Sequence, residues 1–84
     1  GLIYRAYAYF IMQKVGEYGE DILESEENVL WYLGQANVWV ENRNVYLNGK
    51  PMSDEELHST DVTDMLERMR KDNPGVGDFL QQAD

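Results

Sequence analysis

The residue types of nucleophilic catalysis lie close together in one short segment. Ser53 and Ser59 flank His58, the only histidine of the chain, and Asp61 follows shortly after. A serine nucleophile needs a histidine base and an orienting carboxylate, but these groups are normally brought together from separated elements of a rigid scaffold. Helix capping explains a local run of this kind better. We therefore expect no catalytic residue and predict that the protein is not an enzyme.

The same segment holds the best candidate metal ligands. Asp54, His58 and Asp61 share one face if a helix runs through them without interruption, and carboxylates suit magnesium or calcium. The chain has no cysteine, however, and the EF-hand spacing is absent. Acidic residues are in any case favoured in the first turn of a helix. We predict no metal site and no cofactor.

Acidic residues form two blocks that contain no lysine or arginine. Six acids lie between Glu17 and Glu27, and six more between Asp54 and Glu67. If both blocks lie on one surface, their carboxylates stand in for nucleic-acid phosphates and attract a basic protein; otherwise they are solvated helix faces. The candidate acidic residues are Glu20, Glu24, Glu27, Asp54, Asp61 and Asp64.

The negative net charge argues against partners that are themselves negatively charged. The chain carries 16 acids and 7 bases, a net charge of −9. Direct binding to nucleic acid or to an anionic membrane needs clustered lysine and arginine, so we predict neither. The absence of cysteine fits a reducing compartment, and we expect a cytoplasmic protein.

Aromatic residues are the second group of candidates. They form the core of a small protein, or they bind a partner, since tyrosine and tryptophan are enriched at interface hot spots. The first segment is apolar on nearly every side, and the short remaining chain would struggle to cover it. The candidate aromatic residues are Tyr4, Tyr7, Tyr9, Phe10, Trp39 and Tyr46.

Four helical segments are expected to carry these residues. The pattern predicts helices over Leu2–Val15 and Asp21–Leu33, with the first ended by Gly16 and Gly19. Ser53 and Glu56 have the spacing of a capping box. Apolar residues at i, i+3, i+4 and i+7 predict an amphipathic helix up to Asn73, and a short last helix docks back onto the body.

The segment from residue 37 to residue 48 predicts a β-hairpin. Two β-rich runs flank a polar tip, and a loop centred on Asn42 and Arg43 pairs Trp39 with Tyr46. A three-residue loop would break that pairing, so an even loop is favoured. Asn48-Gly49 then ends the second strand with a turn.

These features predict a single α+β domain over residues 1–84, dominated by helices, in the order α-α-β-β-α-(short α). The chain begins with glycine, which fits methionine removal, a tag scar or excision from a longer protein equally well. The leading hypothesis is a non-catalytic assembly subunit that binds a protein partner or itself. The alternative is an acidic inhibitor or nucleic-acid mimic. Small size and acidity would suit an accessory protein encoded by a phage or mobile element.

Overall fold

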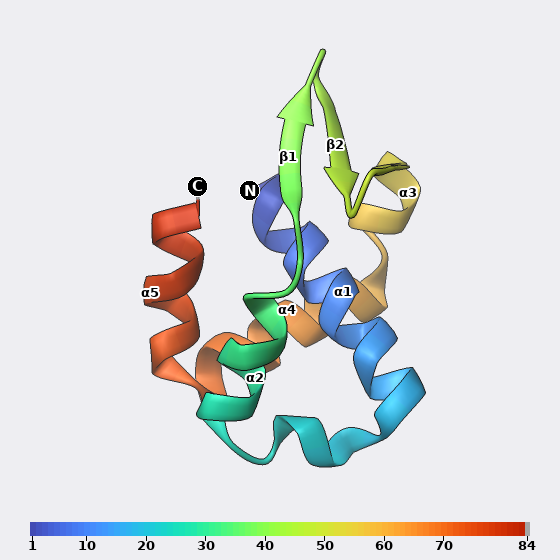
Figure 1. Ribbon diagram of the computed structural model, residues 1–84. Coiled ribbons are helices and arrows are strands. Elements are labelled where there is room, and N and C mark those ends of the chain that lie inside the picture. Colours follow the sequence, from blue (N-terminus) through green and yellow to red (C-terminus); the bar gives the residue numbers. More distant parts are fainter. Residues whose placement is uncertain (84) are drawn as a thin grey trace.

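The computed structural model describes residues 1–83 and shows a small helix-dominated α+β fold, as predicted (Figure 1). A three-stranded antiparallel sheet in the order β1-β2-β3 interrupts the series of helices. The elements in chain order are α1 (Leu2–Tyr18), the 3₁₀ helix η1 (Glu20–Leu23), α2 (Glu26–Leu33), β1 (Val38–Glu41), β2 (Asn44–Leu47), β3 (Lys50–Met52), α3 (Asp54–Leu57), α4 (Thr60–Asp72) and α5 (Pro74–Ala83).

The first helix is longer than predicted. Gly16 remains inside α1, and the helix ends only at Tyr18. Gly19 then takes a φ of 93°, a backbone conformation that is readily open to glycine alone, and its N–H donates to the carbonyl oxygen of Val15. The expected stop at Gly16 was wrong, because a glycine inside a helix costs only about 1 kcal/mol against alanine.

The second predicted helix is two elements. Asp21–Leu33 was expected to be continuous, but η1 ends at Leu23 and α2 begins after Ser25. Ser25 has an extended backbone, and its hydroxyl accepts a hydrogen bond from the N–H of Asn28 at 3.1 Å. Serine is among the preferred N-cap residues, so it starts a new helix where the apolar spacing alone suggested one helix.

The hairpin has the predicted register. Val40 pairs with Val45, and Trp39 pairs with Tyr46, on either side of the Asn42-Arg43 loop. The turn at Asn48-Gly49 was also expected, but it leads into a third strand, β3, that was not predicted. Asn-Gly between strands is a strong hairpin signal. The Lys-Pro-Met run after it is too short to show the alternation of apolar and polar residues by which a strand is recognised.

The C-terminal half contains three helices. Ser53 and Glu56 form the predicted capping box of α3, and the hydroxyl of Ser59 caps α4. Because α3 ends at Leu57 and α4 starts at Thr60, the continuous helix that a shared metal face required does not form. The helix α5 begins with Pro74, a residue well suited to the first helical position.

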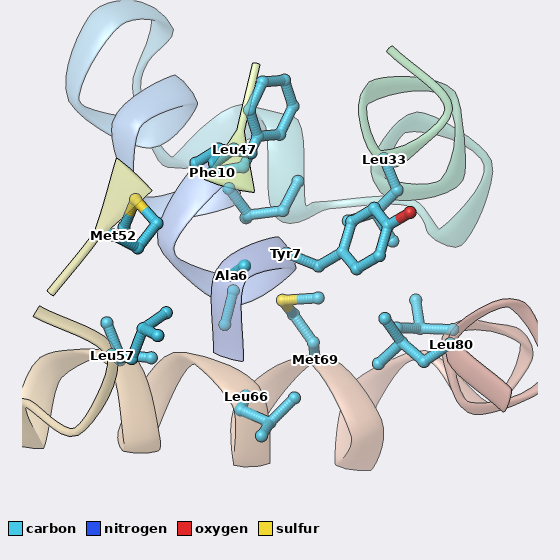
Figure 2. Packing of buried hydrophobic residues seen from close by; sticks show 14 of the residues in the cluster. Ala6, Tyr7, Phe10, Leu33, Leu47, Met52, Leu57, Leu66, Met69 and Leu80 are labelled. Carbon is cyan, nitrogen blue, oxygen red and sulfur yellow. The ribbon is translucent and has the colours of Figure 1, made fainter. Parts of the chain in front are cut away.

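The core lies around α1, with the sheet, α2, α4 and α5 packed against it. Figure 2 shows Tyr7 of α1 directed toward Leu33 of α2 and Leu80 of α5. The ring of Tyr7 also meets the ring of Phe79 edge-on, with centroids 5.5 Å apart. Ala6 and Ala8 are fully buried, and their small side chains let neighbouring elements approach the helix closely.

Two polar contacts between distant segments fix the arrangement. The guanidinium of Arg5 in α1 donates to the carbonyl oxygen of Leu57 at 3.1 Å and to the hydroxyl of Thr63 at 2.8 Å. A carboxylate oxygen of Glu26 in α2 accepts from the N–H of Gly75 at 3.1 Å. The first contact ties α1 to α3 and α4, and the second ties α2 to the first turn of α5.

Candidate interaction surfaces

The outer face of the sheet carries an aromatic row. Side chains alternate between the two faces of a strand, so Trp39, Tyr46 and Pro51, which oppose one another in register, share a face. The opposite face buries Val45, Leu47 and Met52 against the helices. The rings of Trp39 and Tyr46 stack at 5.5 Å with 6° between their planes, and Trp39 is 40% exposed. We call Trp39, Tyr46 and Pro51 the aromatic row.

The hairpin extends beyond the helices that support it (Figure 1). Val40 lies on the inner face of the sheet, yet 51% of its surface is exposed, because the helical body does not reach that far along β1. The inner neighbours Val45 and Leu47 are nearly fully buried. The distal half of the hairpin therefore presents apolar side chains on both faces, a combination that suits contact with another protein.

The predicted aromatic residues of α1 lie mostly inside the protein. Tyr7 is 7% exposed and Phe10 is 4% exposed, so both belong to the core. Burial raises the pKa of the Tyr7 hydroxyl, which favours its neutral form. Tyr4 and Tyr9 are half-buried, and the Arg70 guanidinium lies 4.9 Å from the Tyr4 ring centroid. Trp39 and Tyr46 are the two predicted aromatic residues that lie on the sheet, where they share its outer face.

A second exposed aromatic group lies outside the six candidate residues predicted from the sequence. Tyr18 at the end of α1 is 61% exposed and Trp31 in α2 is 64% exposed, with Tyr32 between them. Tyr32 lies 5.0 Å from Trp31 and 6.1 Å from Tyr18, measured between ring centroids. A signal existed: Val29 and Leu33 share the buried face of α2, and Trp31, two residues from each, must lie on the other side.

The structure brings together three of the six predicted acidic residues. Asp61 and Asp64 in α4 line an open hollow of about 230 Å³ with Met12, Met65 and Arg68. Glu20 joins them through Arg68, whose guanidinium lies 3.4 Å from its carboxylate. We call Glu20, Asp61 and Asp64 the acidic face.

The other predicted acids do not line this hollow. Asp54 is in the first turn of α3, Glu24 caps the end of η1, and Glu27 is in the first turn of α2. All three are exposed. The positions of Asp54 and Glu27 fit the preference for acids at helix N-termini.

Glu56 is the acid with a perturbed ionisation. The backbone N–H of Ser53 donates to its Oε1 at 3.1 Å, and the Ser53 hydroxyl donates to the same oxygen at 3.0 Å. These bonds, with smaller contributions from Tyr9 and Lys50, hold the pKa of Glu56 below its ordinary value. The lowered pKa is explained by the capping box and needs no catalytic role.

The segment with catalytic residue types is used for structure. The hydroxyls of Ser53 and Ser59 cap α3 and α4, and Nδ1 of the exposed His58 lies 3.0 Å from the carbonyl oxygen of Asp54. Within residues 1–83, no three histidine, aspartate or glutamate side chains converge as metal ligands. The hollow of about 230 Å³ beside α4 is smaller than the ligand pockets of about 300–1,000 Å³ typical of proteins.

Comparison with known proteins adds no relative: no protein-family model, no curated protein and no solved structure matches this chain. Among the described residues, none of the helices has the length and apolar content that crossing a bilayer requires.

Proposed function

We propose that this protein is a non-catalytic interaction module, a small assembly subunit of the cytoplasm that binds a protein partner through its β-sheet. The observation that carries the proposal is the exposed aromatic row on a hairpin that projects from the body. Stacked aromatic rings offer a large rigid contact area with little side-chain entropy to lose, which is why they recur at binding hot spots.

The remaining aromatic surface supports the same function. Tyr18, Trp31 and Tyr32 form a second exposed cluster, separate from the sheet. We place the main contact on the sheet, because the row there crosses three strands and Val40 adds exposed apolar surface on the opposite face.

The acidic face supports a second candidate, an inhibitor or nucleic-acid mimic that binds a basic protein. Asp61 and Asp64 are exposed on one side of α4, and Glu20 lies next to them. Arg68 stands among these three carboxylates and offsets part of their charge. A surface that mimics phosphates gains nothing from a cation at its centre, so we rank this candidate below the first.

The experiment is affinity capture, with crosslinking, from the cells that produce the protein, using three baits. The baits are the wild type, Trp39→Ser/Tyr46→Ser and Asp61→Lys/Asp64→Lys. The proposal predicts one specific protein, or the chain itself, retained by the wild type and the acidic-face variant but lost by the aromatic-row variant.

Two other outcomes overturn the proposal. Loss with the acidic-face variant alone favours the inhibitor or mimic. Capture of no specific protein by any of the baits contradicts both candidates. Circular dichroism of each bait must match that of the wild type, since all four substituted side chains lie outside the fully buried core.

A further inference from the structure

The two edges of the sheet differ in what they offer to another strand. In an antiparallel pair, residues alternate between those whose backbone groups bond across to the neighbouring strand and those whose groups point away. The N–H of Asn48 donates to the carbonyl of Asn37 at 2.7 Å, which fixes the alternation in β1. Trp39 and Glu41 then bond to β2, whereas the N–H and C=O of Val38 and Val40 point outward.

The edge formed by β3 is closed to further pairing. Lys50 follows a two-residue turn and bonds back to Leu47, so the next residue, Pro51, turns its backbone nitrogen outward. Proline has no N–H to donate, and it is a common means of blocking an exposed strand edge.

The edge formed by β1 carries no such block. It contains no proline and no lysine. Within residues 1–83, no hydrogen bond to another segment involves the backbone of Val38 or Val40. Three of the four residues of β1 are exposed. A row of unpaired N–H and C=O groups of this kind is a template for strand addition.

The charge of this region suits an approach by a second copy. Residues 34–53 contain one acid, Glu41, and two bases, Arg43 and Lys50, so they carry a net charge of +1. The whole chain carries −9, which leaves −10 on the rest. Like charges oppose the meeting of two acidic bodies, and the sheet is where two copies come together with the least repulsion.

On the basis of the function proposed above, we propose that two copies pair antiparallel through their β1 strands and form one continuous six-stranded sheet. In an antiparallel pair, two residues that exchange backbone hydrogen bonds lie directly opposite each other. Val38 and Val40 carry the outward N–H and C=O groups, so each must lie opposite one of these two residues in the second copy. Centring the two-fold axis on Trp39 sets Val38 opposite Val40 of the second copy, and Val40 opposite Val38 of that copy. Other symmetric registers leave one of these residues opposite a turn or a loop.

This register matches side chains as well as backbone. The Trp39 side chains of the two copies become cross-strand neighbours, which extends the aromatic row across all six strands, and the exposed Val40 packs beside Val38 of the other copy. The two Glu41 side chains stand four residues apart, about 14 Å at roughly 3.4 Å per residue. That exceeds the Debye length of about 8 Å at physiological salt, so their repulsion is screened.

The contact is short, which sets the expected affinity. Four-residue strands bury less than the roughly 1,200 Å² of stable complexes, and we expect a dissociation constant on the order of 10 µM or above. Raising the salt concentration should tighten the dimer, because it screens repulsion between the acidic bodies.

The test combines sedimentation with residue-resolved amide exchange from about 5 µM to 1 mM protein. We expect a monomer–dimer equilibrium in which the amides of Val38 and Val40 become protected as concentration rises. Val40→Pro removes an outward N–H that has no hydrogen-bond partner among residues 1–83 of the monomer. It should weaken dimerisation by about thirtyfold or more, because each dimer loses two hydrogen bonds.

Matched variants keep the result decisive. Val40→Thr retains the N–H and the branched side chain and should dimerise within a few-fold of the wild type. If Val40→Pro fails to fold, Val40→Lys, which charges the edge, should also give a monomer. A wild type that stays monomeric at 1 mM, or a dimer whose Val38 and Val40 amides remain unprotected, overturns the pairing. Either result leaves the proposed function to stand or fall on the capture experiment.

Discussion

At the scale of single residues, the two turns of the sheet hold the chain's left-handed backbone conformations other than Gly19, within residues 1–83. Asn42 and Arg43 have φ of 51° and 67°, and Asn48 and Gly49 have φ of 51° and 85°. Positive φ at both central residues fits the hairpin turn that prefers Asn-Gly. The second turn has that sequence, whereas the first places an arginine where its Cβ is unfavourable.

We therefore expect Arg43→Gly to stabilise the protein by about 1 kcal/mol, since the left-handed conformation costs an L-residue roughly that amount. The measurement is urea denaturation. The matched control is Gly49→Ala, which has open space around the new methyl group and should lose about 1 kcal/mol from the backbone conformation alone. A lower stability for Arg43→Gly would show that its side chain supports the turn.

The capping box predicts a dependence of stability on pH. The pKa of Glu56 is lower in the folded chain than its ordinary value, so folding favours the ionised carboxylate. This stabilisation is complete above the unfolded pKa of about 4.3 and is lost as the pH falls through the lowered folded value. Glu56→Gln should therefore reduce the urea midpoint at pH 7, and the difference from the wild type should shrink as the pH falls below the unfolded pKa of about 4.3.

The control for this prediction lies in the same turn. Glu55→Gln removes an exposed carboxylate that makes no hydrogen bond to Ser53 among the described residues. It should leave the midpoint close to that of the wild type at both pH values. An equal, pH-independent loss for Glu56→Gln would mean that the amide fails for steric reasons and that charge plays no part.

At the scale of elements, the contact between α2 and α5 depends on one glycine. A methyl group at Gly75 would collide with the Glu26 carboxylate, which accepts the hydrogen bond of the Gly75 N–H. Gly75→Ala should displace that carboxylate and lose a hydrogen bond worth about 1 kcal/mol, so it should be less stable by about that amount than an alanine substitution elsewhere in α5 that gains helix propensity without a collision. Thermal and urea unfolding measure the loss.

Gly77 of the same helix is the natural control. A methyl group at Gly77 meets no atom within 4 Å, so Gly77→Ala should gain up to about 1 kcal/mol through helix propensity. If both substitutions stabilise the protein equally, the Glu26 contact does not hold α5 in place.

The sheet shows how far sequence reasoning extends at this scale. The register of β1 and β2 was predictable from the sequence. Side chains alternate between the two faces of a strand, and a loop with an even number of residues keeps Trp39 opposite Tyr46. The strand β3 was not, since a three-residue run containing Pro51 lacks every usual strand signal. It is recognised by what precedes it, the Asn48-Gly49 turn, which calls for a returning strand.

The helices and the site show the limits of local patterns. Spacing predicted an apolar face of α4 made of Val62, Met65, Leu66 and Met69, of which all but the half-buried Met65 are buried. It did not predict that Tyr7 and Phe10 would be covered, because burial depends on how closely separate elements approach, and the fully buried Ala6 and Ala8 permit that approach. The gathering of Glu20, Asp61 and Asp64 around Arg68 is likewise tertiary, as it joins η1 to α4.

At the scale of the whole molecule, the aromatic row and most of the acidic charge occupy different regions. The sheet carries the aromatic row, and residues 34–53 have a net charge of +1 with Glu41 as their one acid, whereas the remaining acids lie outside this region. The acidic body repels other acidic molecules, whereas the sheet region, with its net charge of +1, opposes such contact less. This separation fits specific contact through the sheet better than capture through the body.

The acidic body also predicts how stability responds to salt. With a net charge of −9, the wild type should become more stable as salt screens self-repulsion. Arg68→Ala removes the cation next to Glu20, Asp61 and Asp64 and should cost up to about 1 kcal/mol at low ionic strength. At about 0.5 M salt most of that loss should disappear, because exposed charges no longer interact over their separation.

The control for Arg68→Ala is Lys71→Ala in the same helix. Lys71 is exposed and makes no ion pair within residues 1–83, so its removal should change the urea midpoint less than the removal of Arg68 at low salt. Both variants lower the positive charge by one, and the comparison separates local from overall electrostatics. Equal losses would mean that only net charge matters. A loss for Arg68→Ala that persists at high salt would assign its role to the packing of its side chain beside Met12 and Met65.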